Sequence, residues 1–334
     1  MSKINSALLE KLLMTFGPSG NEERIREVIK EEIKDYVDEI KVDALGNLIG
    51  IKKGNGKKIM IASHMDEIGI MITNIDEKGF LRFTNLGGVS PFTSLYQRVM
   101  FADGTIGVVG MEKLDEIKDL KLNKMYIDIG ASSKEEAVKK VNVGDVACFY
   151  APFVQKDDAL VSKAMDDRIG CFVSIEALKA LKNSPNEVYF VFTVQEEVGL
   201  RGAKTAAYGI NADLGIAIDV TATGDTPKAA TMDVSMGKGA AIKIKDNSVI
   251  AHPAVKNLMT QIAKENDIPF QYEILDMGGT DSGAIHLTRS GIPSGVISIP
   301  CRYVHSPSEM VSASDVENAI KLLVKILEKE EINM

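Results

Sequence analysis

The chain has 334 residues, 45% of them hydrophobic and 26% charged, which is enough to bury a full core and to form more than one folding unit. Its formal net charge of -8 argues against a nucleic-acid-binding protein, because binding to a phosphate backbone depends on clustered Lys and Arg. Three widely spaced cysteines indicate neither a disulfide framework nor a thiolate metal site.

We do not expect a targeting signal at the amino terminus. Its first eleven residues interrupt their apolar positions with charge, so they lack the continuous apolar core of a signal peptide. No stretch approaches the ~18 uninterrupted apolar residues of a membrane span. We therefore expect a cytoplasmic protein that has neither a membrane nor nucleic acid as a partner.

Two amphipathic helices are predicted first. Apolar residues recur at helical spacing over residues 4–13 and, after a Gly-Pro-Ser-Gly turn, over residues 25–36. Residues 41–52 and 58–62 then read as strands around the polar turn at 54–56. The second strand leads directly into Ser-His-Met-Asp.

Residues 68–159 have a different sequence pattern. Short β-type runs alternate with glycine turns, and only residues 113–121 and 133–140 suggest helical turns. This pattern predicts a small β-rich domain, a barrel or a sandwich, inserted into the first unit. The main domain would then comprise residues 1–67 plus 160–334.

Strand and helix alternate again after the insertion. The predicted strands cover residues 188–194, 214–220, 270–275 and 295–299, and the predicted helices cover 169–181, 254–266, 281–289 and 314–328. Such alternation is typical of a doubly wound α/β sheet. The fold class expected is therefore α/β, a doubly wound mixed sheet with an inserted barrel-like domain.

Acidic and imidazole side chains gather where these strands end. They are His64, Asp66, Asp166, Asp167, Glu196, Glu197, Asp219 and His305. Because ligands of open α/β sheets bind at the carboxyl ends of the strands, we expect these groups to meet at one edge. Nitrogen and oxygen donors without sulfur suit a hydrolytic divalent-metal site, and zinc or cobalt accepts both. The number of acids allows two ions ~3.5–4 Å apart, which together could activate one water.

Simpler interpretations exist for each element. Asp166 and Asp167 could be a helix cap and first-turn acid, and Glu196 with Glu197 could form a solvated loop. His252 and His286 are interpreted as ordinary structural histidines, because neither follows a strand beside acids. Asp219 is harder to explain this way, since an unpaired carboxylate at the end of a buried strand is costly.

Several strings resemble the M42 family of dinuclear metalloaminopeptidases. They occupy residues 63–69 (SHMDEIG), 164–168 (AMDDR), 195–202 (QEEVGLRG), 219–221 (DVT) and 302–307 (RYVHSP), with GPSGNE at 17–22 and MGGTD at 277–281. The family includes tetrahedral and glutamyl aminopeptidases, and some members carry an endoglucanase label. The resemblance spans the whole chain in order.

The resemblance implies a role for each matched residue. The metal ligands would be His64, Asp166, Glu197, Asp219 and His305, with Asp166 bridging two ions. Glu196 would be the general base that takes a proton from the attacking water, and Asp66 would orient the imidazole of His64. The family places Gly278, Gly279 and Thr280 beside the pocket for the first side chain, with Arg201 nearby.

The family's inserted domain is a dimerisation domain. The resemblance therefore implies self-association, with dimers assembling into a hollow dodecamer that admits only short or unfolded peptides. The expected activity is removal of N-terminal residues from short peptides, with two divalent ions per subunit, zinc or cobalt.

Two other classes of protein stay open. An endo-glycosidase would also use two carboxylates, but it would not need His64 or His305, and the chain has no tryptophan to stack on sugars. A non-catalytic metal-binding protein would leave Glu196 beside Glu197 unexplained. The sequence lacks a GxSxG string, a Walker A string and a strand-linked GxGxxG, so it does not favour a serine hydrolase or a nucleotide-binding protein.

Overall fold

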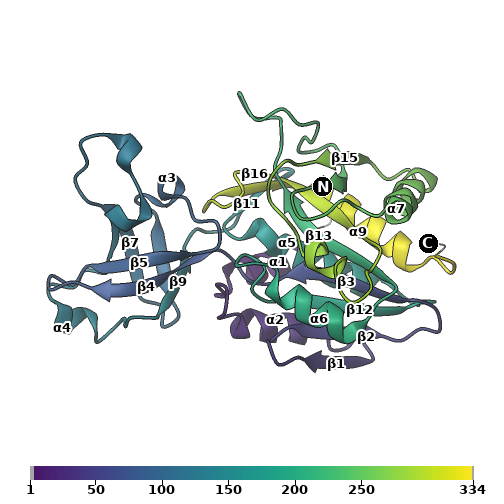
Figure 1. Ribbon diagram of the computed structural model, residues 1–334, viewed down its shortest axis with the longest axis horizontal. Coiled ribbons are helices and arrows are strands. Elements are labelled where there is room, and N and C mark those ends of the chain that lie inside the picture. Colours follow the sequence, from purple (N-terminus) through teal and green to yellow (C-terminus); the bar gives the residue numbers. More distant parts are fainter. Residues whose placement is uncertain (1–3, 333–334) are drawn as a thin grey trace.

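The computed structural model describes residues 4–332 and consists of a layered α/β body with a β-barrel standing beside it (Figure 1). The expected fold class is therefore confirmed. Residues 1–3 and 333–334, which the sequence analysis placed in the main domain, lie outside the described residues.

The body is built on an eleven-stranded mixed sheet. Its path runs β1 (Glu39–Val42), β2 (Leu48–Lys52), β12 (Glu187–Thr193), β3 (Lys58–His64), β13 (Leu214–Thr221), β16 (Ser294–Arg302), β17 (Glu309–Ser312), β11 (Ala159–Ser162) and β10 (Val154–Lys156). Off this path, β14 (Ala240–Lys245) pairs with β16 and with β15 (Phe270–Ile274). The neighbours β12, β3, β13 and β16 are parallel, so their carboxyl ends share one edge.

Helices cover both faces of this sheet. Ile59 and Ile61 of β3 belong to the main core, which packs under α1 (Ser6–Met14), α2 (Glu23–Ile33), α5 (Met165–Ala180), α7 (Pro253–Glu265) and α9 (Ala313–Leu327). Met60 and Ala62 point to the opposite face, into a core shared with α6 (Arg201–Ile210) and α8 (Ser282–Ile285). This alternation along one strand explains why the central strands are apolar throughout.

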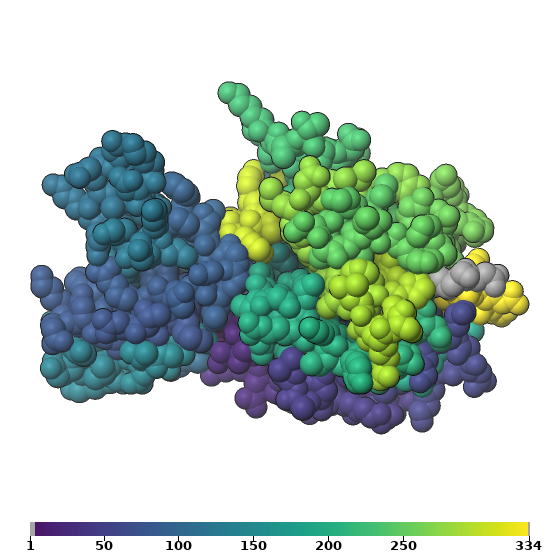
Figure 2. Space-filling model, in the orientation of Figure 1, coloured from purple at the N-terminus to yellow at the C-terminus, as the bar shows by residue number. Residues whose placement is uncertain are grey.

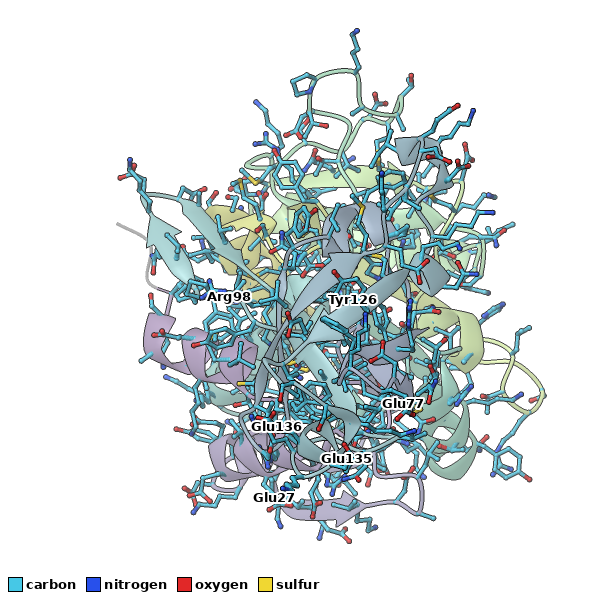
Figure 3. All side chains as sticks on the ribbon, turned by 90° about the vertical axis from the view of Figure 1, so that its left-hand side faces the viewer. Glu27, Glu77, Arg98, Tyr126, Glu135 and Glu136 are labelled. Atoms are coloured by element: carbon cyan, nitrogen blue, oxygen red, sulfur yellow. The ribbon has the colours of Figure 1, made fainter. Side chains whose placement is uncertain are left out.

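The barrel closes through six antiparallel strands. In order around the barrel they are β4 (Gly69–Ile75), β5 (Leu81–Leu86), β8 (Met125–Asp128), β7 (Ile106–Met111), β6 (Arg98–Phe101) and β9 (Val146–Phe149). Four short helical segments join them: α3 (Pro91–Ser94), η1 (Ile117–Asp119), η2 (Leu122–Lys124) and α4 (Lys134–Ala137). The barrel has a core of its own. It faces the viewer in Figure 3, where Tyr126 of β8 and Glu135 and Glu136 of α4 are labelled.

The structure differs from the predicted elements in several places. The single strand predicted over residues 41–52 is two strands, because the carboxylate of Asp43 accepts hydrogen bonds from the backbone N–H groups of Leu45, Gly46 and Asn47 and closes a turn. The elements α6, β11, β14 and β17 were not predicted, and the helix predicted over residues 281–289 contains only the single turn of α8.

Three further observations concern the described residues. Within residues 4–332, no helix combines the length and the hydropathy that a bilayer crossing requires. Cys148, Cys171 and Cys301 are free and buried. Residues 222–239, which contain no helix or strand, stand out from the body at the top of Figure 2.

Arg168 joins the amino-terminal helices to the junction with the barrel. Its side chain is fully buried, and Nη1 donates to the carbonyl oxygens of Leu12 (2.6 Å) and Thr15 (3.0 Å) at the end of α1. Nη2 donates to Glu67 Oε1 at 3.3 Å, just before β4. Lys163 Nζ donates to the other oxygen of Glu67 at 2.6 Å, so one carboxylate holds two buried cations.

We predict that Arg168→Met lowers the free energy of unfolding by about 3–5 kcal/mol, because removing one member of a buried ionic network leaves its partners uncompensated. Chemical denaturation followed by circular dichroism measures the change. Lys34→Met, at an exposed position on the end of α2, is the control and should change stability by less than about 0.5 kcal/mol. Equal stability of the two variants would contradict the role given to Arg168.

Candidate functional site

Five separate segments bring the predicted side chains to one edge of the sheet. His64 ends β3, Asp166 begins α5, Glu196 and Glu197 follow β12, Asp219 lies near the end of β13, and His305 follows β16. All six line one cavity of about 710 Å³. The parallel strands β12, β3, β13 and β16 thus deliver their polar ends to the place where α/β sheets bind ligands.

Asp166 lies between the two histidines. Its Oδ1 is 2.9 Å from His64 Nε2, and its Oδ2 is 3.3 Å from His305 Nε2. On the His305 side, Glu197 Oε2 is 3.2 Å from Nε2, and on the His64 side, Asp219 Oδ1 is 4.0 Å from Nε2. The donors therefore form two groups that share one carboxylate.

The donor set fits divalent cations. His64, Asp166 and Glu197 offer ligand atoms within 4.8 Å of one another, and so do His64, Asp167 and Asp219. The groups contain imidazole nitrogen and carboxylate oxygen, the types that zinc and similar ions bind. Among the described residues, Glu197 Oε1 is a buried oxygen without a hydrogen-bond partner, which is expected of an atom that would contact an ion.

Asp167 has a second task. Its Oδ1 accepts from the backbone N–H of Gly170 at 3.0 Å, three residues along the first turn of α5. Its Oδ2 accepts from the backbone N–H of His64 at 3.2 Å. The capping interpretation considered for the Asp-Asp pair therefore applies to Asp167, while Asp166 faces the cavity.

Asp66 fixes three members of the site. Its Oδ1 lies 3.4 Å from His64 Nδ1 and accepts from the backbone N–H of Glu196 at 3.0 Å. Its Oδ2 accepts from the backbone N–H of Glu197 at 3.2 Å and from Ser19 Oγ at 2.6 Å. One fully buried carboxylate thus positions an imidazole and the backbone of both glutamates.

Glu309 plays a matching part that the sequence analysis missed. Its Oε1 accepts from the backbone N–H of His305 at 2.8 Å, and its Oε2 accepts from the backbone N–H of Asp166 at 3.0 Å. The side chain is buried, which together with the negative charge of Asp166 raises its pKa to about 8. In the sequence, Glu309 looks like one more acid in a Ser-Pro turn, so nothing local marks its role.

The cluster shifts the pKa values of its own members. Burial raises the pKa of Glu196 well above its usual range, and the carboxylates of Asp219 and Glu197 add to this effect. Burial would lower the pKa of His64 and His305, but the adjacent carboxylates outweigh it and raise both values. Without a metal ion, these shifts favour the protonated, positively charged form of both imidazoles.

Only two of the four predicted substrate contacts line the cavity. Gly278 and Gly279 line the cavity, whereas Thr280 is buried and outside its lining. Arg201 is exposed, donates to Gln195 Oε1 at 3.1 Å and is also outside the lining. Lys243, which the sequence analysis did not single out, does line the cavity.

Comparison with known proteins gives a matching family model and a similar curated relative. A family model described as M42 glutamyl aminopeptidase matches residues 46–322. A putative aminopeptidase of Acetivibrio thermocellus is 61% identical over 96% of this chain and 97% of its own length.

Solved structures similar to this chain include peptidases and one that is titled endoglucanase. An aminopeptidase of the archaeon Desulfurococcus kamchatkensis superposes with a TM-score of 0.93 at 42% identity, covering 97% of this chain and 94% of that one. The Pyrococcus horikoshii TET1 peptidase, described as assembling into a tetrahedron or a large octahedral shell, gives 0.88 at 37% identity over 96% and 98%. A Thermotoga maritima structure titled endoglucanase gives 0.82 at 33% identity over 96% of each chain.

We predict that metal binding releases protons and weakens as the pH falls. An ion must displace the protons that the carboxylates hold on His64 and His305, so a lower pH favours the metal-free form. Titration calorimetry with Zn²⁺ at pH 7 in buffers of different ionisation enthalpy measures the protons released. Heats that do not depend on the buffer would contradict the prediction.

Glu309→Gln should weaken metal binding by about 10–100-fold, because an amide cannot accept hydrogen bonds from both backbone N–H groups with its two terminal atoms. Competition with a chelator measures the affinity for Zn²⁺. Glu10→Gln, at an exposed position on α1, is the matched control and should bind as the unaltered protein does. Equal affinities in the two variants would remove Glu309 from the account of the site.

Proposed function

The chain belongs to the M42 family of peptidases and is an aminopeptidase, and we propose that it uses two divalent metal ions to remove N-terminal residues from short peptides. The observation that carries the proposal is the position of Asp166, whose two oxygens face a different histidine each. A single carboxylate placed in this way suits a pair of ions that share one ligand.

We assign the ligands as two overlapping sets. His64, Asp166 and Asp219 would hold one ion, and Asp166, Glu197 and His305 would hold the other. Zinc and cobalt both accept this mixture of nitrogen and oxygen donors. When bound, such ions supply Lewis acidity to the scissile carbonyl and to the attacking water.

Glu196 is assigned as the general base. Its carboxylate lines the cavity, and its Oε2 lies 4.0 Å from His64 Nε2, beside the proposed metal ligands without bridging them. It would accept a proton from the attacking water and return it to the leaving amine. Asp66 contributes by holding the backbone N–H of Glu196, which keeps the base in place.

The cavity would hold the first residue of the substrate. Gly278 and Gly279 line it, which supports their predicted contact with the first side chain. Thr280 and Arg201 stay predictions as substrate contacts. The carboxylates of the cluster would attract the free amino group of a peptide, which an exopeptidase must recognise.

We further propose that the chain self-associates through its barrel, as dimers that build a dodecamer. Support comes from the shells described for the Pyrococcus horikoshii TET1 peptidase and from exposed aromatic residues of the barrel, Phe92 on α3 and nearby Tyr96. Residues 68–159 are proposed as the inserted dimerisation domain, although β10 within that range joins the mixed sheet. A cytoplasmic location stays a prediction.

We predict that Glu196→Gln lowers kcat on amino-acyl p-nitroanilides by about 10²–10⁴-fold while the protein keeps its metal content, because the variant loses the proton acceptor and no proposed ligand. Rates after addition of Zn²⁺ or Co²⁺ are compared with metal content from elemental analysis. An N-acetylated substrate is the control and should not be cleaved by either protein.

Two results would contradict the proposal. Hydrolysis of carboxymethylcellulose without peptide hydrolysis would favour the glycosidase alternative. Full metal content with no activity on either substrate would favour a non-catalytic metal-binding protein.

A further inference from the structure

The wall of the cavity beside the metal cluster is mostly apolar. Side chains from four separate segments contribute to it, namely Leu200, Val220, Leu275, Met277 and Val304. Leu275 and Met277 follow β15, and Val220 lies in β13 directly after the proposed ligand Asp219. A substrate bound at the ligands would therefore place its first side chain against hydrocarbon.

One cation interrupts this wall. Lys243 of β14 lines the cavity although its side chain is only 1% exposed. Its Nζ donates to Glu273 Oε1 and lies 3.2 Å from Asp246 Oδ2. Thr221 Oγ1 also donates to Glu273 Oε1 at 2.8 Å, so that carboxylate is held from two sides.

The charges of this triad, Lys243 with Glu273 and Asp246, are paired with one another. Two buried carboxylates contact one ammonium group, so the net charge is negative and Lys243 has no uncompensated charge for an acidic substrate. A basic side chain would meet Lys243 first, because neither acid of the triad lines the cavity. Against this wall, both kinds of charged side chain would lose their hydration without gaining a partner, because the other acids that line the cavity are the proposed metal ligands and the proposed general base.

We propose that the cavity selects an uncharged, apolar N-terminal side chain of the size of leucine or methionine, and that Lys243, Glu273 and Asp246 set this selectivity. The inference rests on the aminopeptidase function proposed above and names its substrate class. It differs from what the glutamyl description of the matching family model would suggest.

The test compares kcat/KM for leucyl, methionyl, glutamyl and lysyl p-nitroanilides on the full-length protein loaded with Co²⁺. We expect the kcat/KM of leucyl and methionyl substrates to exceed that of the two charged ones by at least about 10²-fold, because the cavity would bury a charged side chain without a partner. A faster rate on glutamyl or lysyl substrate would overturn the inference and leave the aminopeptidase function intact. No hydrolysis of any substrate would overturn both.

One substitution should shift the selectivity toward acidic substrates and another should shift it toward basic ones. Glu273→Gln leaves Lys243 with less compensation, so the ratio of glutamyl to leucyl kcat/KM should rise at least about tenfold. Lys243→Met leaves two acids unpaired, so the ratio of lysyl to leucyl kcat/KM should rise by a similar factor. A purely structural role would lower all rates together and move neither ratio, which would overturn the role given to the triad.

A matched control and a measurement on the unaltered protein complete the test. Glu265→Gln makes the same chemical change at an exposed position on α7 and should leave both ratios unchanged. If a triad variant does not fold, inhibition of the unaltered enzyme by free amino acids still decides the question. L-leucine should inhibit at lower concentration than L-glutamate or L-lysine, and the reverse order would contradict the inference.

Discussion

Mutual repulsion among buried carboxylates is the constraint on which the rest of this structure depends. Asp166, Glu196, Glu197 and Asp219 converge on one cavity, and the histidines beside them are the only cations that contact them directly among the described residues. Such a cluster would separate unless the backbone held its members in place. The fold meets this requirement by fixing strand ends in a parallel sheet and by directing backbone N–H groups at supporting acids.

The barrel takes part in the site as well as standing beside it. Gly88, in the segment between β5 and α3, lines the cavity, and a Cβ atom there would lie 2.3 Å from His305 Nδ1. Only glycine allows this close approach. Thr93 Oγ1 of α3 donates to the carbonyl oxygen of His305 at 3.4 Å, so the two bodies meet at a proposed ligand. Whatever positions the barrel therefore also affects the shape of the cavity.

Much of the fold and of the ligand cluster could be predicted from the sequence, because long apolar strands are locally encoded and their carboxyl ends converge by a general rule. The roles of the residues that support the ligand cluster could not be predicted from the sequence. Glu309 and Lys243 are ordinary charged residues in their local sequence, and their roles arise from partners that are close only in the folded chain. Arg201 shows the converse, since a residue inside a family motif is exposed to solvent outside the cavity lining.

Glu309 accepts hydrogen bonds from the backbone N–H groups of His305 and Asp166 and not from their side chains, which are the groups that would contact an ion. The backbone positions that Glu309 fixes therefore do not depend on the identity or the presence of a cation. Because these hydrogen bonds join parts of the chain itself, folding alone sets the backbone positions of His305 and Asp166. If the chain binds metal as proposed, its ligands are therefore positioned before an ion arrives.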